Sequence, residues 1–329
     1  MKNHPQAKII ATGSAVPERI LSNQDFEKIV DTTDEWIVSR SGIRERRVTD
    51  EHTATSDLAA EASRKALQEA GLSAEDLDMI IIGTATPDHV FPSTACFLQD
   101  HLGAVNAAPM DVGAACSGFL YSLSVGRAMI ESGHYRTVLV SGAETLTKIT
   151  DYQDRGTCVL FGDAAGVALL QATDEDRGIL QTYLGGNGSL WHLLHMPAGG
   201  SRRPASHETV NRREHYIRMS GNEVFKYAVK AMGDSALQVL KQAGLTADDV
   251  DLMIPHQANI RIIKATARRI HLPMERVYVN IDRYGNTSAA SIPLAMDEAR
   301  RKGLHKPGDI WLLVAFGGGF TWGSALIRW

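Results

Sequence analysis

The sequence carries one pattern twice, and this repetition limits the folds that the chain can adopt. Residues 71–80 (GLSAEDLDMI) resemble residues 244–253 (GLTADDVDLM), which lie 173 positions later. Residues 138–140 (VLV), shortly before a glycine, resemble residues 312–314 (LLV) at an offset of 174. Similarity at a nearly constant separation predicts a duplicated structural unit, because unrelated domains have no reason to keep such a spacing.

The boundary between the two copies is predicted near residues 173–178, a charged stretch that ends in glycine. We therefore predict an N-terminal half over residues 1–174 and a C-terminal half over residues 175–329. A third pair of similar apolar segments is only 157 positions apart. The first half therefore contains about 17 additional residues, which we place around residues 147–157.

Apolar strands alternate with amphipathic helices in both halves. Residues 55–70 have the apolar spacing of a helix, with Thr55 or Ser56 as a plausible N-cap, and the apolar run at 79–82 predicts a strand. A second long helix is predicted over residues 222–243. Continuous apolar strands between helices are typical of mainly parallel sheets covered on both faces, so we predict an α/β fold in a five-layered α/β/α/β/α arrangement. Further strands are predicted at residues 252–254, 310–315 and 324–327.

The composition limits the class of protein. Of 329 residues, 44% are hydrophobic and 22% are charged, and a net charge of −4 gives no reason to expect a nucleic-acid partner. Residues 1–6 are polar, and no apolar run approaches the roughly 20 residues that span a bilayer. We therefore expect neither a signal peptide nor a membrane segment. Three widely spaced cysteines without a Cys-x-x-Cys pair predict a reducing, cytoplasmic setting and no metal site.

Cys116 lies where a predicted strand meets a predicted helix. The short apolar segment 107–110 predicts a buried strand, and the apolar stretch from Phe119 to a stop at Gly133 predicts a buried helix. The unpaired N–H groups at the start of that helix would stabilise a thiolate, and small neighbouring residues leave room for a substrate. An inert core thiol is the alternative interpretation, because free cysteines are commonly buried.

Three segments of the second half could supply partners for this thiol. His256 directly follows a predicted strand, at a strand end where parallel sheets place functional groups. Asn286 lies in a turn of small residues before another helix, and the glycine run 317–319 can bring a backbone N–H close to an oxyanion. A structural histidine and an N-capping asparagine are the alternatives for the two side chains. Together, the Cys, His and Asn predict nucleophilic catalysis.

A basic stripe follows His256. Arg261, Lys264 and Arg268 share one face of a predicted helix, with Arg269 beside them. Such a patch on a chain of negative net charge would attract an acidic partner or a phosphate-bearing substrate. The alternative is a solvated helix face without a partner, which is the usual role of a run of charges.

These residues resemble a known family over essentially the whole chain. The chain resembles the β-ketoacyl-acyl-carrier-protein synthase III family, condensing enzymes of type II fatty acid synthesis within the thiolase superfamily. The matching motifs are DTTDEWI (31–37), RSGIR (40–44), AACSGF (114–119), DRGT (154–157), FGD (161–163), GNEVFK (221–226), PHQAN (255–259), GNTS (285–288) and FGGGFTWG (316–323).

The resemblance implies the thiolase fold, a homodimer and a ping-pong reaction that needs no cofactor, with acyl-CoA as a substrate. Cys116 would take the acyl group of a short acyl-CoA, most simply acetyl-CoA, as a thioester. Malonyl on acyl carrier protein would then lose CO2 and attack this thioester to give a 3-ketoacyl carrier protein, which initiates fatty acid biosynthesis. The backbone N–H groups of Cys116 and Gly318 would hold the acyl oxyanion, while His256 and Asn286 would stabilise the enolate formed on decarboxylation.

The resemblance also implies binding residues. Trp36 and Arg155 would enclose the adenine of coenzyme A, and Phe91 would reach across the dimer to shape the acyl pocket of the second copy. The implied coenzyme A site comprises Thr32, Trp36, Arg40, Arg155, Met219, Phe225 and Asn259. The implied docking surface for acyl carrier protein comprises Lys226, Gln257, Ala258, Asn259, Ile260, Arg261, Arg268 and Arg269.

Two features depart from the family pattern. Ser117 follows the predicted nucleophile where the family more often has alanine, and we expect no change of mechanism. Residues 191–215 are rich in arginine and histidine and show no regular period, so we predict a long surface excursion there. This excursion leaves the rim of the site and the acyl preference open.

Other functions fit parts of the sequence. Related condensing enzymes of secondary metabolism share the same motifs. A cysteine hydrolase of acyl thioesters would also use a small-x-Cys-x-small turn, but it has no need for a duplicated half or for Asn286. A catalytically silent binder of acyl-CoA or carrier protein would have no need for Cys116, His256 and Asn286 together.

Overall fold

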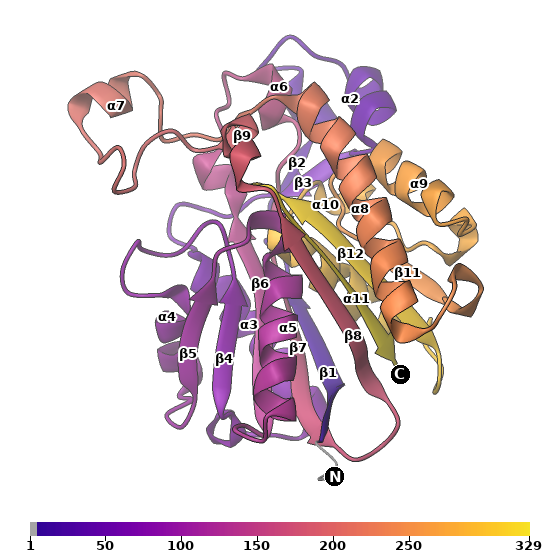
Figure 1. Cartoon of the computed structure of the whole chain (residues 1–329). Helices are drawn as coiled ribbons and strands as arrows, with labels where there is room; N and C mark the ends of the chain where they lie inside the picture. The colour runs from indigo at the N-terminus through magenta and orange to yellow at the C-terminus, as the bar shows by residue number, and fades with distance from the viewer. Residues whose placement is uncertain (1–4) are drawn as a thin grey trace.

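Two separate sheets form the framework of the chain (Figure 1). The computed structural model describes residues 5–329. Our expectation that the chain has no signal peptide concerns its first residues, and residues 1–4 lie outside the described residues. The first sheet has the strand order β1 (Gln6–Ala15), β7 (Asp163–Thr173), β6 (Thr137–Thr145), β4 (Met79–Gly83) and β5 (Ala108–Val112). The second sheet has the order β11 (Leu252–Pro255), β12 (Ile310–Gly317), β13 (Thr321–Arg328) and β8 (Gly178–Gly186).

Two helices lie between the sheets and form the middle layer. They are α5 (Gly118–Glu131) and α11 (Ser291–Arg301). Phe119 of α5 and Met296 of α11 are completely buried in one apolar cluster that also contains strand residues of both sheets. The predicted buried helix after Cys116 is therefore confirmed, and burial of apolar surface from both halves joins them into one core.

Helices also cover the outer face of each sheet, which completes the five layers (Figure 1). Ile81 of β4 faces the middle layer, whereas Ile80 and Ile82 face the outer helices. Burial on both faces explains why the strand is a continuous apolar run, and the predicted α/β fold with five layers is confirmed. The outer helices are α3 (Thr55–Ala70) and α4 (Thr94–Leu102) on the first sheet, and α8 (Gly221–Ala243) and α9 (Ile260–Arg269) on the second.

The prediction of mainly parallel sheets is wrong. β4 pairs in parallel with β5 and β6, and β11 pairs in parallel with β12, but the other four strand pairs of the two main sheets are antiparallel. A continuous apolar strand reports burial on two faces and carries no information on direction. Antiparallel pairing follows from short connections such as Gly318–Phe320 between β12 and β13, which contain no crossover helix.

Two local predictions also need correction. The strand predicted to be buried before Cys116 is β5, an edge strand whose residues are exposed or half-buried. Helix α3 begins where predicted, but its N-cap is Ala54, whose backbone N–H donates to the Asp57 side chain. Thr55 and Ser56 lie inside the helix and bond to other segments instead, because their hydroxyls are buried against the loop that follows β4.

The boundary predicted between residues 174 and 175 stays a prediction. β7 ends the first sheet at Thr173 and β8 starts in the second sheet at Gly178, so the chain passes from one sheet to the other in this stretch. β8 nevertheless packs against β1 of the first sheet, and the two halves share their central core.

Shorter elements surround the framework and shape one end of it. Residues 191–215 form the predicted excursion, in which α7 (His207–Asn211) projects away from the body (Figure 1). The buried Asp151 holds the base of this arm through ion pairs with Arg213 and Arg218. Among residues 5–329, no helix is long and apolar enough to cross a membrane. The remaining short elements are β2 (Ile20–Ser22), α1 (Asn23–Phe26), α2 (Asp34–Ser41), β3 (Glu45–Arg47), α6 (Arg155–Cys158), β9 (Leu194–His195), β10 (Arg218–Met219) and α10 (Ile281–Tyr284).

Candidate active site

Cys116 lies in a tight turn that strands of the second half hold in place. The turn is the 3-10 helix η2 (Ala115–Ser117), between β5 and α5. A Cβ atom at Gly317 of β12 would lie 2.6 Å from the backbone nitrogen of Cys116, so only glycine permits this approach. The Thr321 hydroxyl donates to the Ala114 carbonyl at 2.8 Å, and the Ser117 hydroxyl donates to the Thr321 carbonyl at 3.2 Å. These contacts fix the thiol at the junction of the two halves.

His256 follows β11 directly and is almost completely buried, with 1% of its surface exposed. Its backbone N–H donates to the Val314 carbonyl, and its Nδ1 atom lies 2.7 Å from the hydroxyl of Ser291, the first residue of α11. Burial lowers the pKa of His256 to about 3, because a charged imidazole loses its hydration there. The imidazole is therefore neutral at physiological pH. Sequence reasoning included Ser291 only as a small residue and missed this contact.

Asn286 lies between α10 and α11 with its backbone fixed on both sides. Its N–H donates to the Leu160 carbonyl, and its own carbonyl accepts from Gly162. The side-chain Oδ1 accepts from the backbone N–H of Ser288 at 2.9 Å, which is the local bond that the capping alternative predicts. The Nδ2 group has no hydrogen-bond acceptor among residues 5–329, so it is free to donate to a ligand.

The three side chains line one pocket. Cys116, His256 and Asn286 contribute to the wall of a cavity of about 110 Å³. A second pocket beside α2 shares lining residues with the first, so the two adjoin, and together they form what we call the tunnel. The shared residues are Leu160, Met219, Gly221, Phe225 and Asn259, three of which were predicted to line a coenzyme A site.

The resting form of Cys116 differs from the prediction. Burial raises the pKa of the thiol to about 12, the nearby Glu144 carboxyl raises it further, and a hydrogen bond from Ser288 opposes this effect. The thiol is therefore neutral at rest, and the stabilised thiolate expected at the start of a helix is not the resting state. A substrate or an internal base must help to remove its proton.

Two backbone donors are available beside the thiol. Neither the N–H of Cys116 nor that of Gly318 donates a hydrogen bond within residues 5–329. Of the three glycines predicted to adopt unusual backbone angles, only Gly319 has a positive φ, of 136°. Gly317 is needed for close approach instead, as its contact with Cys116 shows.

The mouth of the tunnel carries an aromatic ring between two cations. The guanidinium carbons of Arg40 and Arg155 each lie 5.0 Å from the ring centre of Trp36. An adenine could enter between Trp36 and Arg155 only by displacing the Arg155 side chain, which is bonded to the Asp31 carbonyl at 2.9 Å. The Thr32 hydroxyl is buried nearby without a hydrogen-bond partner among the described residues. Unsatisfied buried hydroxyls are costly, so this group is suited to a ligand.

The basic stripe on α9 is exposed, but some predicted docking residues are not. Arg261, Lys264 and Arg268 point to solvent. Gln257 is 1% exposed, and its amide bonds to backbone groups of Pro255, Tyr278 and Asn280. Gln257 therefore cannot face a carrier protein, because a buried amide must be satisfied internally. Ala258, Asn259 and Ile260 are half-buried, and the Asn259 side chain caps α9 while donating to the Arg40 carbonyl. Arg269 and Lys226 are paired with Asp234 and Glu223 respectively.

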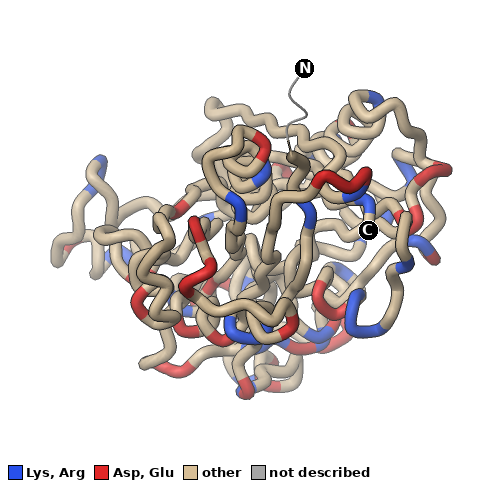
Figure 2. The backbone as a smooth tube through the Cα atoms, turned by 90° about the horizontal axis from the view of Figure 1, so that it is seen from below, with Lys and Arg blue, Asp and Glu red and all other residues tan. Residues whose placement is uncertain are grey.

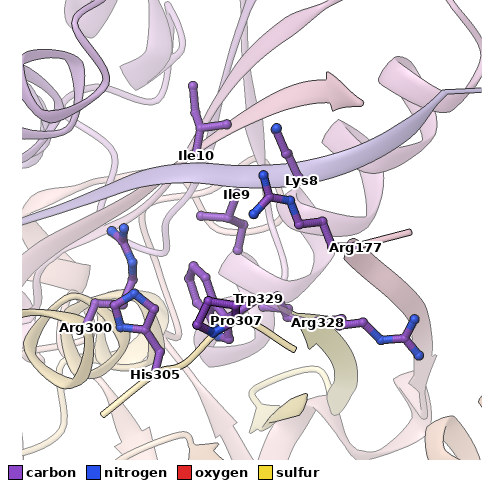
Figure 3. A pocket seen from close by; sticks show the side chains of 10 residues that line it. Lys8, Ile9, Ile10, Arg177, Arg300, His305, Pro307, Arg328 and Trp329 are labelled. Carbon is purple, nitrogen blue, oxygen red and sulfur yellow. The ribbon is translucent and has the colours of Figure 1, made fainter. Parts of the chain in front are cut away.

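A further cavity lies near both chain termini and is lined by basic side chains (Figure 3). Its cations are paired with carboxylates, and acidic and basic segments are interleaved around this end of the molecule (Figure 2). No nucleophile lines it, and no group of His, Cys, Asp or Glu in residues 5–329 could hold a metal ion. The ion pairs are Lys8–Glu175, Arg177–Glu175, Arg300–Glu69 and Arg328–Asp176.

Comparison with known proteins gives one consistent result. Residues 110–188 match the family described as 3-oxoacyl-[acyl-carrier-protein (ACP)] synthase III, and residues 240–329 match the family described as its C terminal part. The chain is 57% identical to the β-ketoacyl-[acyl-carrier-protein] synthase III of Caldanaerobacter subterraneus subsp. tengcongensis, over 98% of both chains.

Solved structures agree with this similarity. The crystal structure of 3-oxoacyl-[acyl-carrier-protein] synthase III from Aquifex aeolicus is 48% identical, with a TM-score of 0.91 over 98% of this chain and 100% of that one. The priming β-ketosynthase of the R1128 polyketide biosynthetic pathway is 33% identical, with a TM-score of 0.91 over 100% of this chain and 97% of that one.

Proposed function

The chain belongs to the 3-oxoacyl-[acyl-carrier-protein] synthase III family, which has the thiolase fold, and on this premise we propose how its residues perform the reaction. The protein is an acyltransferase that condenses acetyl-CoA with malonyl-acyl carrier protein to start fatty acid synthesis. The observation that carries the residue roles is the lining of one pocket by Cys116, His256 and Asn286.

In the first half-reaction, Cys116 attacks the thioester carbonyl of the acyl-CoA and becomes acylated. The free N–H groups of Cys116 and Gly318 hold the carbonyl oxygen as negative charge develops on it. The pantetheine arm occupies the tunnel past Phe225 and Met219, and the adenine displaces Arg155 to stack on Trp36. Arg40 and Thr32 complete this site at the mouth.

In the second half-reaction, the malonyl group enters the same tunnel on the arm of the carrier protein. His256 and Asn286 donate to its thioester oxygen, which becomes the enolate oxygen when CO2 leaves. The proposed role requires Ser291 to donate to Nδ1, so that the neutral imidazole carries its proton on Nε2 and donates toward the pocket. No strong base is needed, because loss of CO2 generates the carbanion, and we propose no cofactor beyond the substrates.

The exposed face of α9 is the proposed dock for the carrier protein. Arg261 and Arg268 are exposed there, and Arg261 also lies at the mouth of the tunnel, with its guanidinium carbon 5.4 Å from the ring centre of Phe225. Positive side chains around the opening would orient an acidic partner so that its arm can enter. Gln257 takes no part, since it is buried.

A homodimer is the proposed assembly. β5 is paired only with β4, and Val90 and Phe91 nearby are 90% and 88% exposed. An edge strand beside exposed apolar side chains is suited to being covered by a second copy. In that assembly Phe91 would reach the acyl pocket of the second copy. The cytoplasmic location stays a prediction.

A condensing enzyme of secondary metabolism is the second candidate function. The similarity to the R1128 priming β-ketosynthase supports it, but that identity of 33% is well below the 57% to the synthase III relative. A cysteine hydrolase is disfavoured because an imidazole whose pKa is lowered to about 3 is a weak general base.

Intact-protein mass measurement with a panel of acyl-CoAs tests the proposed nucleophile. One acyl group should be added to the wild type and to the matched control Cys96→Ser, and none to Cys116→Ser. Addition of malonyl-carrier protein should then discharge the adduct as a 3-ketoacyl product. Absence of an adduct with every short acyl-CoA would contradict the role of Cys116, and release of free acid without malonyl-carrier protein would favour the hydrolase.

A further inference from the structure

A buried carboxyl group lies behind the nucleophile, and the reaction described above does not use it. Glu144, near the end of β6, is completely buried, and burial raises the pKa of its carboxyl. Its oxygens accept from the Thr86 hydroxyl at 2.6 Å, the Thr84 hydroxyl at 3.2 Å and the Ala85 N–H at 3.1 Å. A fourth donor is the N–H of Ala289, at 3.4 Å. Four donors around a buried carboxyl stabilise its ionised form and fix the orientation of the side chain.

The Ser288 hydroxyl connects this carboxyl to the thiol. Its hydrogen bonding lowers the pKa of both the Glu144 carboxyl and the Cys116 thiol, and its turn packs on both the strand of Glu144 and the turn of Cys116. A hydroxyl has one proton to donate, and a carboxylate can only accept. Donation from Ser288 to the sulfur favours the thiolate and lowers the thiol pKa. For proton transfer, Ser288 would accept from the Cys116 S–H while it donates to Glu144, which gives a path for a proton from sulfur to carboxylate.

The backbone holds this path in an unusual conformation. Ser288 has φ of 46°, a left-handed angle that non-glycine residues rarely adopt and that is often found at functional sites. The turn that it begins, η7 (Ser288–Ala290), packs so closely on β6 that a Cβ atom at Gly142 would lie 2.2 Å from the Ala289 carbonyl oxygen. Ser288 is thus held between the strand that carries Glu144 and the turn that carries Cys116.

We propose that Glu144 holds the proton of the Cys116 thiol while the acyl group occupies the sulfur. The proposal rests on the proposed role of Cys116 as the nucleophile. A thiol whose pKa is about 12 has almost no thiolate at neutral pH, and a pantetheine arm that fills the tunnel separates it from solvent. An internal acceptor removes this obstacle, and burial, which raises the pKa of the Glu144 carboxyl, makes its ionised form a stronger proton acceptor than an exposed carboxylate.

Protons and charges balance over the two half-reactions. In the first, the Cys116 sulfur bonds to the acyl carbon, its proton passes through Ser288 to Glu144, and coenzyme A leaves as a thiolate that is protonated by solvent. In the second, malonyl loses CO2, the new carbon–carbon bond forms and the carbon–sulfur bond to Cys116 breaks. The departing thiolate then takes the stored proton back through Ser288, so that Glu144 is again a carboxylate.

Cys116 is the one ionisable partner of Glu144 among residues 5–329. The other groups bonded to Glu144 are hydroxyls and backbone N–H groups, which do not titrate in this range. The charged side chains of the elements packed against β6 are satisfied elsewhere: Asp163 of β7 accepts from Thr49 and Thr147, Arg127 of α5 pairs with Glu131, and Asp297 of α11 accepts from Thr12 and Ser14.

The test compares two reactions of the same thiol in Glu144→Gln. In alkylation by iodoacetamide the tunnel stays open to water, so the rate follows the thiol pKa. Loss of the neighbouring negative charge should lower that pKa and make alkylation at pH 8 about tenfold faster. Acylation by acetyl-CoA, followed by rapid-quench mass measurement, should be about 100-fold slower at pH 7 because the acceptor is lost. The acylation rate of the variant should also rise with pH, while that of the wild type stays level between pH 7 and 9.

Ser288→Ala provides the second arm, and it keeps the four other donors of Glu144. It should slow acylation to a similar extent but also slow alkylation, because the hydrogen bond that lowers the thiol pKa is lost. Ser141→Ala, a buried serine of the same strand that bonds to the Gly166 carbonyl, is the matched control and should change neither rate.

Acylation of both variants at the wild-type rate would overturn the proposal and leave Cys116 as the nucleophile. Equal slowing of acylation and alkylation in Glu144→Gln would also overturn it, because a structural defect has that signature. Failure of the wild type to form any adduct at Cys116 would instead contradict the proposed function itself, so the two failures are distinguishable.

Discussion

The two turns that start the central helices are built alike but carry different chemistry. In the first half, η2 leads into α5, and in the second half, η7 leads into α11. The first residue of each turn has a left-handed backbone, with φ of 45° at Ala115 and 46° at Ser288. These residues are 173 positions apart, which is the offset of the sequence repeat. The repeat predicted from the sequence therefore coincides with a backbone conformation that few non-glycine residues adopt.

Each turn is also closed by a strand of the opposite half, through a glycine. Gly317 of β12 approaches the backbone nitrogen of Cys116, and Gly142 of β6 approaches the carbonyl oxygen of Ala289. At the repeat offset, Ala289 occupies the position that corresponds to Cys116. The same scaffold thus presents a thiol, the proposed nucleophile, on one side and a methyl group on the other.

The difference shows how the two copies divide the work. The first turn carries the thiol, and the second turn, with Asn286 before it and Ser291 after it, orients neutral hydrogen-bond donors toward the thiol. Neither half contains a complete site, since the pocket is lined from both. Variants at equivalent positions of the two turns should therefore fail in different half-reactions.

The largest effect is expected from His256 and Asn286, the two donors near the second turn. His256→Ala and Asn286→Ala should each slow decarboxylation of malonyl-carrier protein by about 100- to 1,000-fold, because each removes a donor to the developing enolate. Acylation of Cys116 should change only a few-fold. Release of labelled CO2 and mass measurement of the acyl-enzyme follow the two steps separately, with Cys116→Ser as the converse control. Equal losses in both steps would mean that the two turns do not divide the reaction.

Alanine substitution at Gly142 and at Gly317 should destabilise the protein to different extents. Gly142→Ala and Gly317→Ala should each lower the free energy of unfolding by about 3 kcal/mol, with the greater loss at Gly142 because its new Cβ would lie 2.2 Å from an oxygen, against 2.6 Å at Gly317. Urea unfolding measures both. Gly113→Ala is the matched control, since no atom lies within 4 Å of its Cβ position and its stability should be unchanged. Wild-type stability of Gly142→Ala would show that the second turn can relax.

The positions of the proposed reacting groups were predictable because each follows a change of local pattern. His256 comes directly after an apolar run, Cys116 lies between an apolar segment and an apolar helix, and Asn286 lies in a turn of small residues. A strand end beside a helix start is a local feature, and the repeat relates the two halves without any knowledge of distant contacts. The five layers followed from the same alternation of strands and helices.

Features that depend on contacts between the halves were not predictable. Glu144 interrupts an apolar strand, which is a signal of a buried polar role, but its contact with Ala289 requires β6 to meet η7 across the molecule. The pKa of the Cys116 thiol also depends on burial between the halves. Burial raises this pKa, whereas the helix start alone had led us to expect a stabilised thiolate. Gln257 was predicted to lie on the surface beside a basic stripe. Its amide instead forms hydrogen bonds that link the end of β11 to the segment before α10.

At the mouth of the tunnel, each half supplies the residues that we propose bind one of the two substrates. The first half supplies Trp36 and Arg155, and the second half supplies the basic face of α9. Arg155→Ala should raise the KM for acyl-CoA about tenfold with little effect on the carrier protein, and Arg268→Glu should show the reverse, a change worth about 1.4 kcal/mol in each case. Lys306→Glu, an exposed cation that lines neither pocket, is the control. Equal effects on both substrates would remove the separation.

The smallest expected effect concerns the charge of His256. The pKa of His256 is about 3 in the folded chain against 6.5 for an exposed histidine, so below pH 6.5 the unfolded chain binds a proton that the folded chain does not. Stability must therefore fall as the pH falls, by about 1 kcal/mol from this group between pH 6.5 and 5.5. Urea unfolding of the wild type and of His256→Gln at both pH values isolates this contribution, because all other titrating groups are common to the two proteins.

The variant should lose about 1 kcal/mol less than the wild type over that interval, while His52→Gln, at an exposed site, should behave as the wild type does. An identical pH dependence in the wild type and His256→Gln would mean that the imidazole takes up its proton in the folded state near its usual pKa. Such a histidine would be a cation beside the thiol at mildly acidic pH, and the two turns would then differ in charge as well as in their reacting groups.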